Sequence, residues 1–185
     1  MKGVDRFLQR WRIRRALACL PGEVRVIDIG AFHGELFESL GPRLRAGFGV
    51  EPLLLAPRTG PRYVIEPGFF PSVRPAEGGW DAVTMLAVLE HIPADQQKVL
   101  ADACHELLRP GGLVVITVPA RAVDHILALL KFLRLIDGMS LEEHYGFRPE
   151  DTARIFAPPR FRLIRHRRFQ LGLNHLFVFA REPAG

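Results

Sequence analysis

The sequence contains little cysteine, and this scarcity excludes two kinds of site. Only Cys19 and Cys104 occur among its 185 residues. Two cysteines cannot build a disulfide scaffold or a four-cysteine zinc site, and such usage suits a reducing compartment. The histidines and acidic residues show no metal-ligand spacing either, so we expect no metal centre.

Long hydrophobic runs are also missing from the chain. The nearest candidate, residues 126–136, is too short to cross a bilayer and carries Lys131 and Arg134. The basic N-terminus has no apolar stretch followed by small residues, so it does not resemble a secretion signal. We therefore expect no membrane span and a cytoplasmic location.

Neither sign of charge dominates. Lys and Arg number 25 against 20 Asp and Glu, which leaves a net charge of +5. The excess is nearly all arginine and gathers near the two ends, in residues 6–15 and 160–168. Such clusters can hold nucleic acid or an acidic partner. They lack the glycine and aromatic pattern of an RNA-binding module, so we favour a solvated face and expect no nucleic-acid partner.

What is present predicts one globular domain. Hydrophobic residues make up 48% of the chain, enough for a core at this length. We expect a single domain over residues 1–185, with an N-terminal helix at 4–19, a core at 24–119, and a cap helix and C-terminal hairpin at 121–182. The expected strands are 24–29, 46–50, 62–66, 81–86, 113–118, 161–169 and 174–181, and the other helices are a short one after Gly34, then 94–108, 121–136 and 149–157.

Strands and helices alternate, which predicts an α/β fold with a parallel sheet and helices on both faces. Pro52, Pro57 and Pro61 leave room only for a stunted helix between the second and third strands. In such sheets, ligands bind beyond the carboxyl ends of the strands. The residues directly after each strand are therefore the candidate functional residues.

The first strand ends in a carboxylate, Asp28, followed by a turn that contains Gly30 and Gly34. A dinucleotide site would show Gly-x-Gly-x-x-Gly here, and that spacing is absent. A carboxylate repels a pyrophosphate but suits a cationic ligand. S-adenosylmethionine fits this description, because it carries an ammonium and a sulfonium and no phosphate.

Further candidate residues follow the next strands. Glu51 comes after the second strand, where an acid accepts hydrogen bonds from both ribose hydroxyls of an adenosine-type ligand. Gly68 and Phe69 come after the third strand, where an adenine ring could lie between apolar walls. The fourth strand leads into residues 85–91, Met-Leu-Ala-Val-Leu-Glu-His.

These stretches, with Leu-Glu-His-Ile at 89–92 and Leu-Arg-Pro-Gly-Gly at 108–112, resemble the class I methyltransferase family in its small type 11 form. The resemblance covers about residues 24–119. It implies an enzyme that uses S-adenosylmethionine as its cofactor. It also implies a Rossmann-like, doubly wound sheet of seven strands, six parallel and one antiparallel.

The resemblance assigns roles to individual residues. Asp28 would hold the amino group of the cofactor, and Glu51 its ribose, while Gly68 and Phe69 would flank the adenine. The glycines of the first loop would pack against the methionine part. The full cofactor-binding set is Asp28, Gly30, Ala31, Phe32, Gly34, Glu51, Pro52, Gly68, Phe69, Leu86 and Ala87.

Two positions depart from the family pattern. Phe32 stands where the family usually has a middle glycine, so its side chain must point away from the cofactor or cover it. Phe69 replaces the acid that often binds the adenine amine, and stacking would substitute for that hydrogen bond. These departures leave open a non-catalytic relative. Two further alternatives stay open. A nicotinamide oxidoreductase would need the missing glycine spacing. A nucleic-acid methyltransferase would use the terminal arginine clusters, although its common Asn/Asp-Pro-Pro-Tyr/Phe signature is absent at residues 86–89.

The expected reaction is in-line displacement of the methyl group by a small-molecule acceptor or a lipid- or sugar-type acceptor. Because the sulfonium is already a good leaving group, no catalytic triad is needed, and none is visible. His91, His144 and Tyr145 are the candidates for orienting or deprotonating the acceptor. The helix predicted at 121–136 is apolar on more than one face, which predicts either a homodimer or an acceptor with an apolar tail.

Overall fold

The structure is a computed structural model that describes residues 3–120 and 147–183, with the side chains of 3–5 left out. Three expectations fall outside the described residues: the helix at 121–136, the homodimer contact on it, and the candidates His144 and Tyr145.

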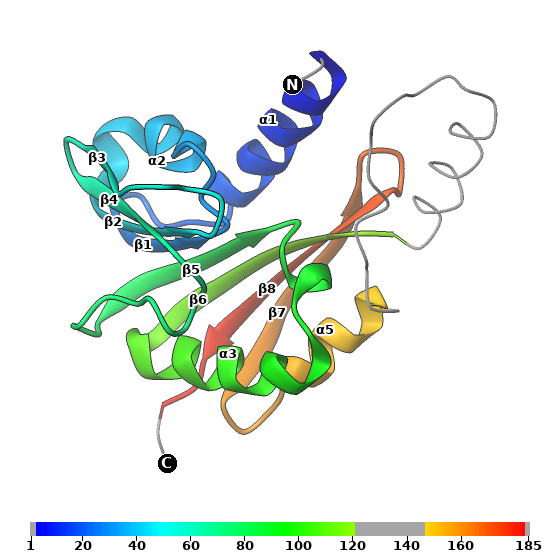
Figure 1. Ribbon diagram of the computed structural model, residues 1–185. Coiled ribbons are helices and arrows are strands. Elements are labelled where there is room, and N and C mark those ends of the chain that lie inside the picture. The colour runs from blue at the N-terminus through cyan, green and yellow to red at the C-terminus, as the bar shows by residue number, and fades with distance from the viewer. Residues whose placement is uncertain (1–2, 121–146, 184–185) are drawn as a thin grey trace.

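In the described part, eight strands form one mixed sheet with helices on both faces (Figure 1). The strands are β1 (Val24–Ile29), β2 (Leu44–Glu51), β3 (Arg58–Gly60), β4 (Tyr63–Pro67), β5 (Trp80–Leu86), β6 (Leu108–Pro119), β7 (Phe161–Phe169) and β8 (Asn174–Arg181). The α-helices are α1 (Gly3–Leu17), α2 (Glu35–Leu40), α3 (Ala94–Leu107) and α5 (Thr152–Ile155), and the 3₁₀ turns are η1 (Gly41–Arg43), η2 (Leu89–His91) and η3 (Pro149–Asp151).

The strand order across the sheet is β3-β4-β2-β1-β5-β6-β8-β7. Strands β4, β2, β1, β5 and β6 join in parallel pairs, whereas β3–β4, β6–β8 and β7–β8 are antiparallel. This confirms a Rossmann-like α/β sheet. The expected count of seven strands, six of them parallel, is wrong, because the sheet has eight strands and three antiparallel pairs.

The additional strand is β3, three residues long at the edge of the sheet. Its Gly60 pairs with Tyr63 of β4, so the two form a tight hairpin around Pro61. From its prolines, the sequence predicts at most a stunted helix in this stretch. Prolines do exclude a helix interior there, but they permit a short edge strand.

Two apolar cores lie on the two faces of the sheet. Ala31 and Leu86, from the predicted cofactor-binding set, belong to one of them. Helices α1 and α2 cover one face through Ala16, Leu36 and Phe37. Helices α3 and α5 cover the other, where Cys104 and Phe156 are fully buried. No helix in the described part has the length and hydropathy that a membrane-spanning helix needs.

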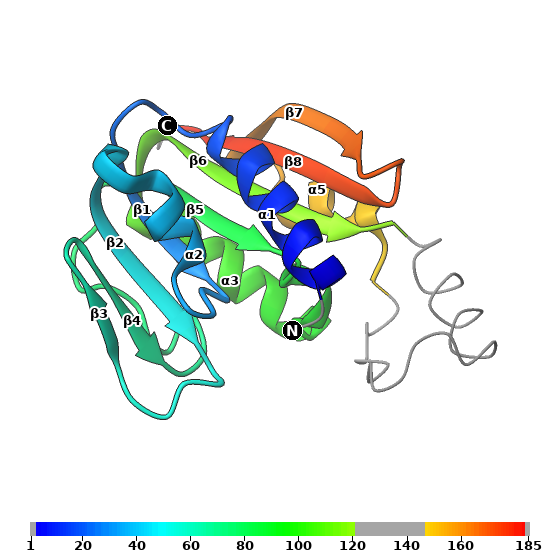
Figure 2. The same cartoon turned by 90° about the horizontal axis from the view of Figure 1, so that it is seen from above.

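Helix α1 crosses the sheet above β5 and β6 (Figure 2). Its anchors come from distant parts of the chain: Gln170 Nε2 donates to the Leu8 carbonyl at 3.0 Å, and the Trp11 ring meets Phe169 edge-on at 6.5 Å. At and just beyond its C-terminal end, Arg43 donates to four main-chain carbonyls, those of Leu17, Leu20, Pro21 and Gly22. Residues from both the early and the late part of the chain therefore hold the helix in place.

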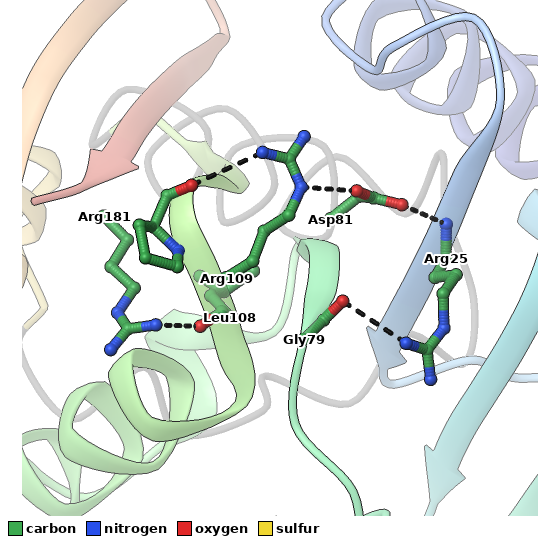
Figure 3. A network of polar contacts seen from close by, with 7 residues as sticks. Arg25, Gly79, Asp81, Leu108, Arg109 and Arg181 are labelled. Carbon is green, nitrogen blue, oxygen red and sulfur yellow. Dashed lines mark hydrogen bonds and ion pairs between the residues drawn. The ribbon is translucent and has the colours of Figure 1, made fainter. Parts of the chain in front are cut away.

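A polar network joins strands β1, β5, β6 and β8 at the edge of the sheet where the parallel strands begin, opposite their carboxyl ends (Figure 3). Asp81 accepts from the Arg25 N–H at 2.8 Å and from Arg109 Nε at 2.6 Å. Arg181 of β8 donates to the Leu108 carbonyl. Burial alone would raise the pKa of Asp81, but the hydrogen bonds from Arg109 and Arg25 outweigh it and hold that pKa below its ordinary value.

Candidate functional site

Asp28 is a buried carboxylate near the carboxyl end of β1, 4% exposed. Thr84 of the neighbouring strand β5 donates to its Oδ1 at 2.6 Å. Burial raises the pKa of Asp28 to about 7, the charges of Glu35 and Glu51 add to the rise, and the Thr84 hydrogen bond opposes it. Among the described residues Asp28 forms no ion pair. A cationic ligand group would supply the missing compensation.

The loop after β1 makes a sharp turn in left-handed backbone. Gly30 has φ 77° and Gly34 has φ 90°. A Cβ on Gly30 would come within 2.5 Å of Val88 Cγ2, so the glycine is required by a close approach as well as by its backbone angle. The N–H groups of Gly30 and Ala31 both donate to the Val50 carbonyl, at 2.9 and 3.2 Å. The loop is thereby fixed against the end of β2.

Phe32, the first departure from the family pattern, keeps the backbone that a glycine would adopt. Its φ is 48°, and its N–H donates to Glu51 Oε2 at 2.9 Å. The half-buried ring lies beside His33, with ring centroids 4.0 Å apart. The charge-assisted hydrogen bond to Glu51 offsets the strain of a non-glycine residue in this region.

Glu51 organises the neighbouring loops from the end of β2. The residue is 6% exposed, and its second oxygen, Oε1, accepts from the Leu53 N–H at 3.0 Å. Its main-chain carbonyl accepts from the Gly68 N–H at 3.3 Å. Each carboxylate oxygen retains acceptor capacity, because a carboxylate has about four lone-pair sites and the backbone uses two. The adjacent Pro52 is exposed.

Gly68 and Phe69 follow β4 and reach the same edge of the sheet. Gly68 has φ 132°, and a Cβ there would lie 2.7 Å from Val73 Cγ2. The Phe69 side chain is 73% exposed, so its ring is not packed into the protein. The structure thus brings this pair to Glu51 through the main chain, with an aromatic ring left facing solvent.

Leu86 and Ala87 lie at the end of β5. Leu86 lines a small cavity together with Asp28, Gly30 and Ala31. Ala87 has φ 62° and donates its N–H to the Thr117 carbonyl at 2.9 Å. His91, a candidate for acceptor chemistry, is half-buried one turn further along, in η2.

The same cavity is lined by residues that the sequence analysis did not select. They come from α1 and from the start of α2: Gln9, Arg12, Ile13, Glu35 and Leu36. Helical spacing alone assigned α1 no role beyond burying a face. Its placement over the cavity follows from contacts with β5 and β6, which no local pattern in the sequence reveals.

Thr117 is a second residue that the motifs did not indicate. It is fully buried, and its Oγ1 has no hydrogen-bond partner among the described residues. Thr117 pairs with Leu86 across β5 and β6, so it projects from the same face of the sheet. A buried hydroxyl without a partner carries a free-energy cost that a ligand would relieve.

The donor set fits S-adenosylmethionine. A buried, unpaired carboxylate at Asp28 matches an ammonium group, and Glu51 offers acceptors at the adjacent strand end. The loop after Asp28 turns at Gly30 and Gly34, and its N–H groups at residues 30–32 already donate to Val50 and Glu51. Among the described residues, no group of three or more His, Cys, Asp or Glu side chains is arranged to hold a metal ion.

This sheet order, with a carboxylate and a glycine turn after the central strand and an acid after the next, defines a class I methyltransferase fold. A protein-family model described as a methyltransferase domain matches residues 2–171. The chain belongs to this family. The predictions of a methyltransferase and of S-adenosylmethionine as its cofactor are confirmed at the level of the family.

Two curated relatives are similar to the chain, and both are named ubiquinone biosynthesis O-methyltransferase. The protein from Colwellia psychrerythraea is 29% identical over 145 residues, which cover 69% of this chain and 56% of the relative. That from Xanthomonas axonopodis pv. citri is 35% identical over 104 residues, which cover 50% of this chain and 41% of the relative. The chain therefore matches only about half the length of these relatives.

A solved structure shows the shared fold over nearly the whole chain. It is the 1,6-didemethyltoxoflavin-N1-methyltransferase of Burkholderia thailandensis, determined with 1,6-didemethyltoxoflavin and S-adenosylhomocysteine bound. It superposes with a TM-score of 0.69 at 22% identity, covering 98% of this chain and 83% of that one.

Proposed function

We propose that the protein transfers a methyl group from S-adenosylmethionine to a small-molecule acceptor or a lipid- or sugar-type acceptor. The observation that carries this proposal is Asp28, a buried carboxylate whose pKa is raised to about 7 and which lacks a cationic partner among the described residues. A group of this kind is costly in the free protein, and a ligand ammonium removes the cost.

Each side of the cavity has a part in holding the cofactor. Asp28 binds the amino group of the methionine part, and Arg12 of α1, which lines the same cavity, binds its carboxylate. Glu51 binds the ribose hydroxyls with the acceptor capacity that Phe32 and Leu53 leave. Gly68 lets the chain approach the adenine closely, and the exposed ring of Phe69 folds onto it.

When bound, S-adenosylmethionine supplies an electrophilic methyl group on a good leaving group, so the protein has mainly to align the acceptor. Positioning of this kind lowers a barrier by up to roughly 7–11 kcal/mol. Leu86 and Ala87 shape the wall where the methyl group lies. His91 follows that wall in the sequence. It takes up a proton from the methyl acceptor when the reaction requires the acceptor to lose one.

The names of the similar proteins support the choice of acceptor class. The curated relatives are O-methyltransferases of ubiquinone biosynthesis, and the solved neighbour acts on the nitrogen of 1,6-didemethyltoxoflavin. Ubiquinone biosynthesis and 1,6-didemethyltoxoflavin both belong to the chemistry of small molecules. We carry over this class alone to the present chain, and not the atom that is methylated.

Calorimetric titration with S-adenosylhomocysteine tests the proposal. We expect micromolar affinity, weakened by about 1.5–3 kcal/mol in Glu51→Ala, the cost of lost hydrogen bonds to a charged group. Glu23→Ala is the matched control, because Glu23 is an exposed acid whose one ion pair within residues 3–120 and 147–183 is with Arg45. Glu51 also holds two backbone N–H groups, so the free energy of unfolding is measured in parallel. A folded wild-type protein that gives no heat at millimolar ligand refutes the proposal and favours a non-catalytic relative.

A further inference from the structure

The structure brings together the two arginine clusters that lie at opposite ends of the sequence. One cluster is on α1 and the other on β7, the last strand at one edge of the sheet. Arg165 Nη1 lies 3.7 Å from Cys19 Sγ, just past the end of α1. A bulge between Leu163 and Arg165 shifts the register, so Arg165 and Arg167 pair with Val178 and Leu176 of the core beneath α1. Both arginines therefore project on the side of the sheet that α1 covers.

We call this surface the arginine face and define it by six exposed residues: Arg6, Arg10, Arg14, Arg15, Arg165 and Arg167. Among the described residues none of the six forms an ion pair with a carboxylate. Arginines elsewhere do, such as Arg45 with Glu23 and Arg74 with Glu106. The outer side of α1 is hollowed, and this hollow is lined by no acidic residue. The arginine face is thus a concentration of uncompensated positive charge.

Apolar side chains protrude among these cations. Phe7 is 60% exposed and meets Trp11 edge-on at 5.7 Å, and both line the hollow on α1. Helical spacing places Arg10 and Arg14 on one side of this aromatic pair and Arg15 on the other. Nearby, the hairpin that holds Leu8 through Gln170 carries Leu171, which is 96% exposed.

We propose that the arginine face binds an anionic lipid surface. Arginines attract the negative headgroups, while Phe7 and Trp11 enter the boundary between headgroups and acyl chains, where aromatic residues are favoured. Single-stranded nucleic acid fits less well, because its bases need open ring faces for stacking. Here Trp11 meets Phe7 at 66° and Phe169 at 65°, so edges rather than parallel faces meet.

The face is separate from the cofactor cavity but shares a helix with it. Gln9, Arg12 and Ile13 point to the cavity, whereas Phe7 and Trp11 lie on the outer side of α1. One helix diameter, about 10 Å, therefore separates bound headgroups from the cavity. This arrangement favours the lipid-type acceptor within the proposed function, because such an acceptor would be met at the surface in which it resides.

The test is sedimentation with vesicles of phosphatidylcholine, with and without an equal amount of phosphatidylglycerol. We expect binding only to the anionic vesicles, and weakening with added salt. The double variant Arg10→Gln/Arg14→Gln should bind about 30-fold more weakly, since each basic residue near such a surface contributes roughly a fivefold factor. Phe7→Ala should also weaken binding, through lost insertion.

The matched control is Arg45→Gln/Arg74→Gln, which removes the same charge from ion-paired sites away from the arginine face. It should bind as the wild type does. Trp11 is an internal reporter: its emission should shift to the blue on anionic vesicles, and the shift should vanish in Trp11→Phe, because Trp80 is buried. Absence of binding at low salt, equal losses in both double variants, or tighter binding of a single-stranded oligonucleotide would overturn the proposal. The same preparation is titrated with S-adenosylhomocysteine. If it binds this ligand but not the vesicles, the lipid proposal fails while the proposed function stands.

Discussion

Replacing Asp28 with asparagine should stabilise the free protein and weaken cofactor binding at the same time. Its pKa lies at about 7 in the folded protein against an ordinary value of 3.8. For an acid with a raised pKa, the contribution to stability is full below the ordinary value and is lost as the pH rises through the raised one. As the pH rises from 4 to 8, this group alone therefore lowers the free energy of unfolding by up to about 4 kcal/mol.

Asparagine preserves the shape and still accepts the Thr84 hydroxyl, but it has no charge to bury. Asp28→Asn should thus be more stable than the wild type at pH 8, by a margin on the order of the same 4 kcal/mol, and nearly equal at pH 4. Urea unfolding at both pH values measures this difference. Asp81→Asn is the control of opposite sign, because the hydrogen bonds from Arg109 and Arg25 hold the pKa of Asp81 low.

The cofactor should respond in the reverse direction. An ammonium ligand requires the ionised carboxylate, so wild-type affinity for S-adenosylmethionine should fall about tenfold from pH 8 to pH 6. Asp28→Asn should lose affinity at pH 8 and lose that pH dependence. Adenosine, which lacks the amino acid part, should be affected far less. A variant no more stable than the wild type at pH 8, or one that weakens both ligands equally, would refute the role of Asp28.

Three further outcomes are expected. At position 32, where φ is 48°, Phe32→Gly should be more stable than Phe32→Ala by about 1 kcal/mol in denaturant unfolding; equal values would mean that the turn relaxes. Arg43→Met should lower the free energy of unfolding by about 2–3 kcal/mol, since four carbonyls at and beyond the end of α1 lose their donor, while exposed Arg45→Met should change it little. Thr117→Val should leave the free protein as stable or more so and reduce kcat/KM, because the Oγ1 lacks a partner in the described residues; unchanged kinetics would restrict Thr117 to packing.

The parts of the site made by single strand ends could be predicted from the sequence. Asp28 lies at the end of a short β-branched strand, Gly30 and Gly34 follow it, and the strand expected at 24–29 is found at Val24–Ile29. Glu51 follows the next strand in the same way. Because parallel strands end at one edge of a sheet, the spacing of such residues along the chain is enough to bring them together.

The parts made by distant contacts could not be predicted. Gln9 and Arg12 reach the cavity only because α1 packs on strands made later in the chain. Thr117 sits inside the most strand-like run of the sequence, where a buried threonine resembles any other β-branched residue. Strand β3 was missed because the prolines that exclude a helix also occur at strand edges.

The seat of α1 also sets an order of events during synthesis. Helix α1 is synthesised well before two residues that anchor it, Phe169 of β7 and Gln170 of the turn that follows. A nascent chain that ends before residue 169 already carries Asp28, Gly30 and Glu51, but the helix over their cavity still lacks its contacts to Phe169 and Gln170. The cofactor pocket should therefore reach its final form only when the hairpin of β7 and β8 has joined the sheet.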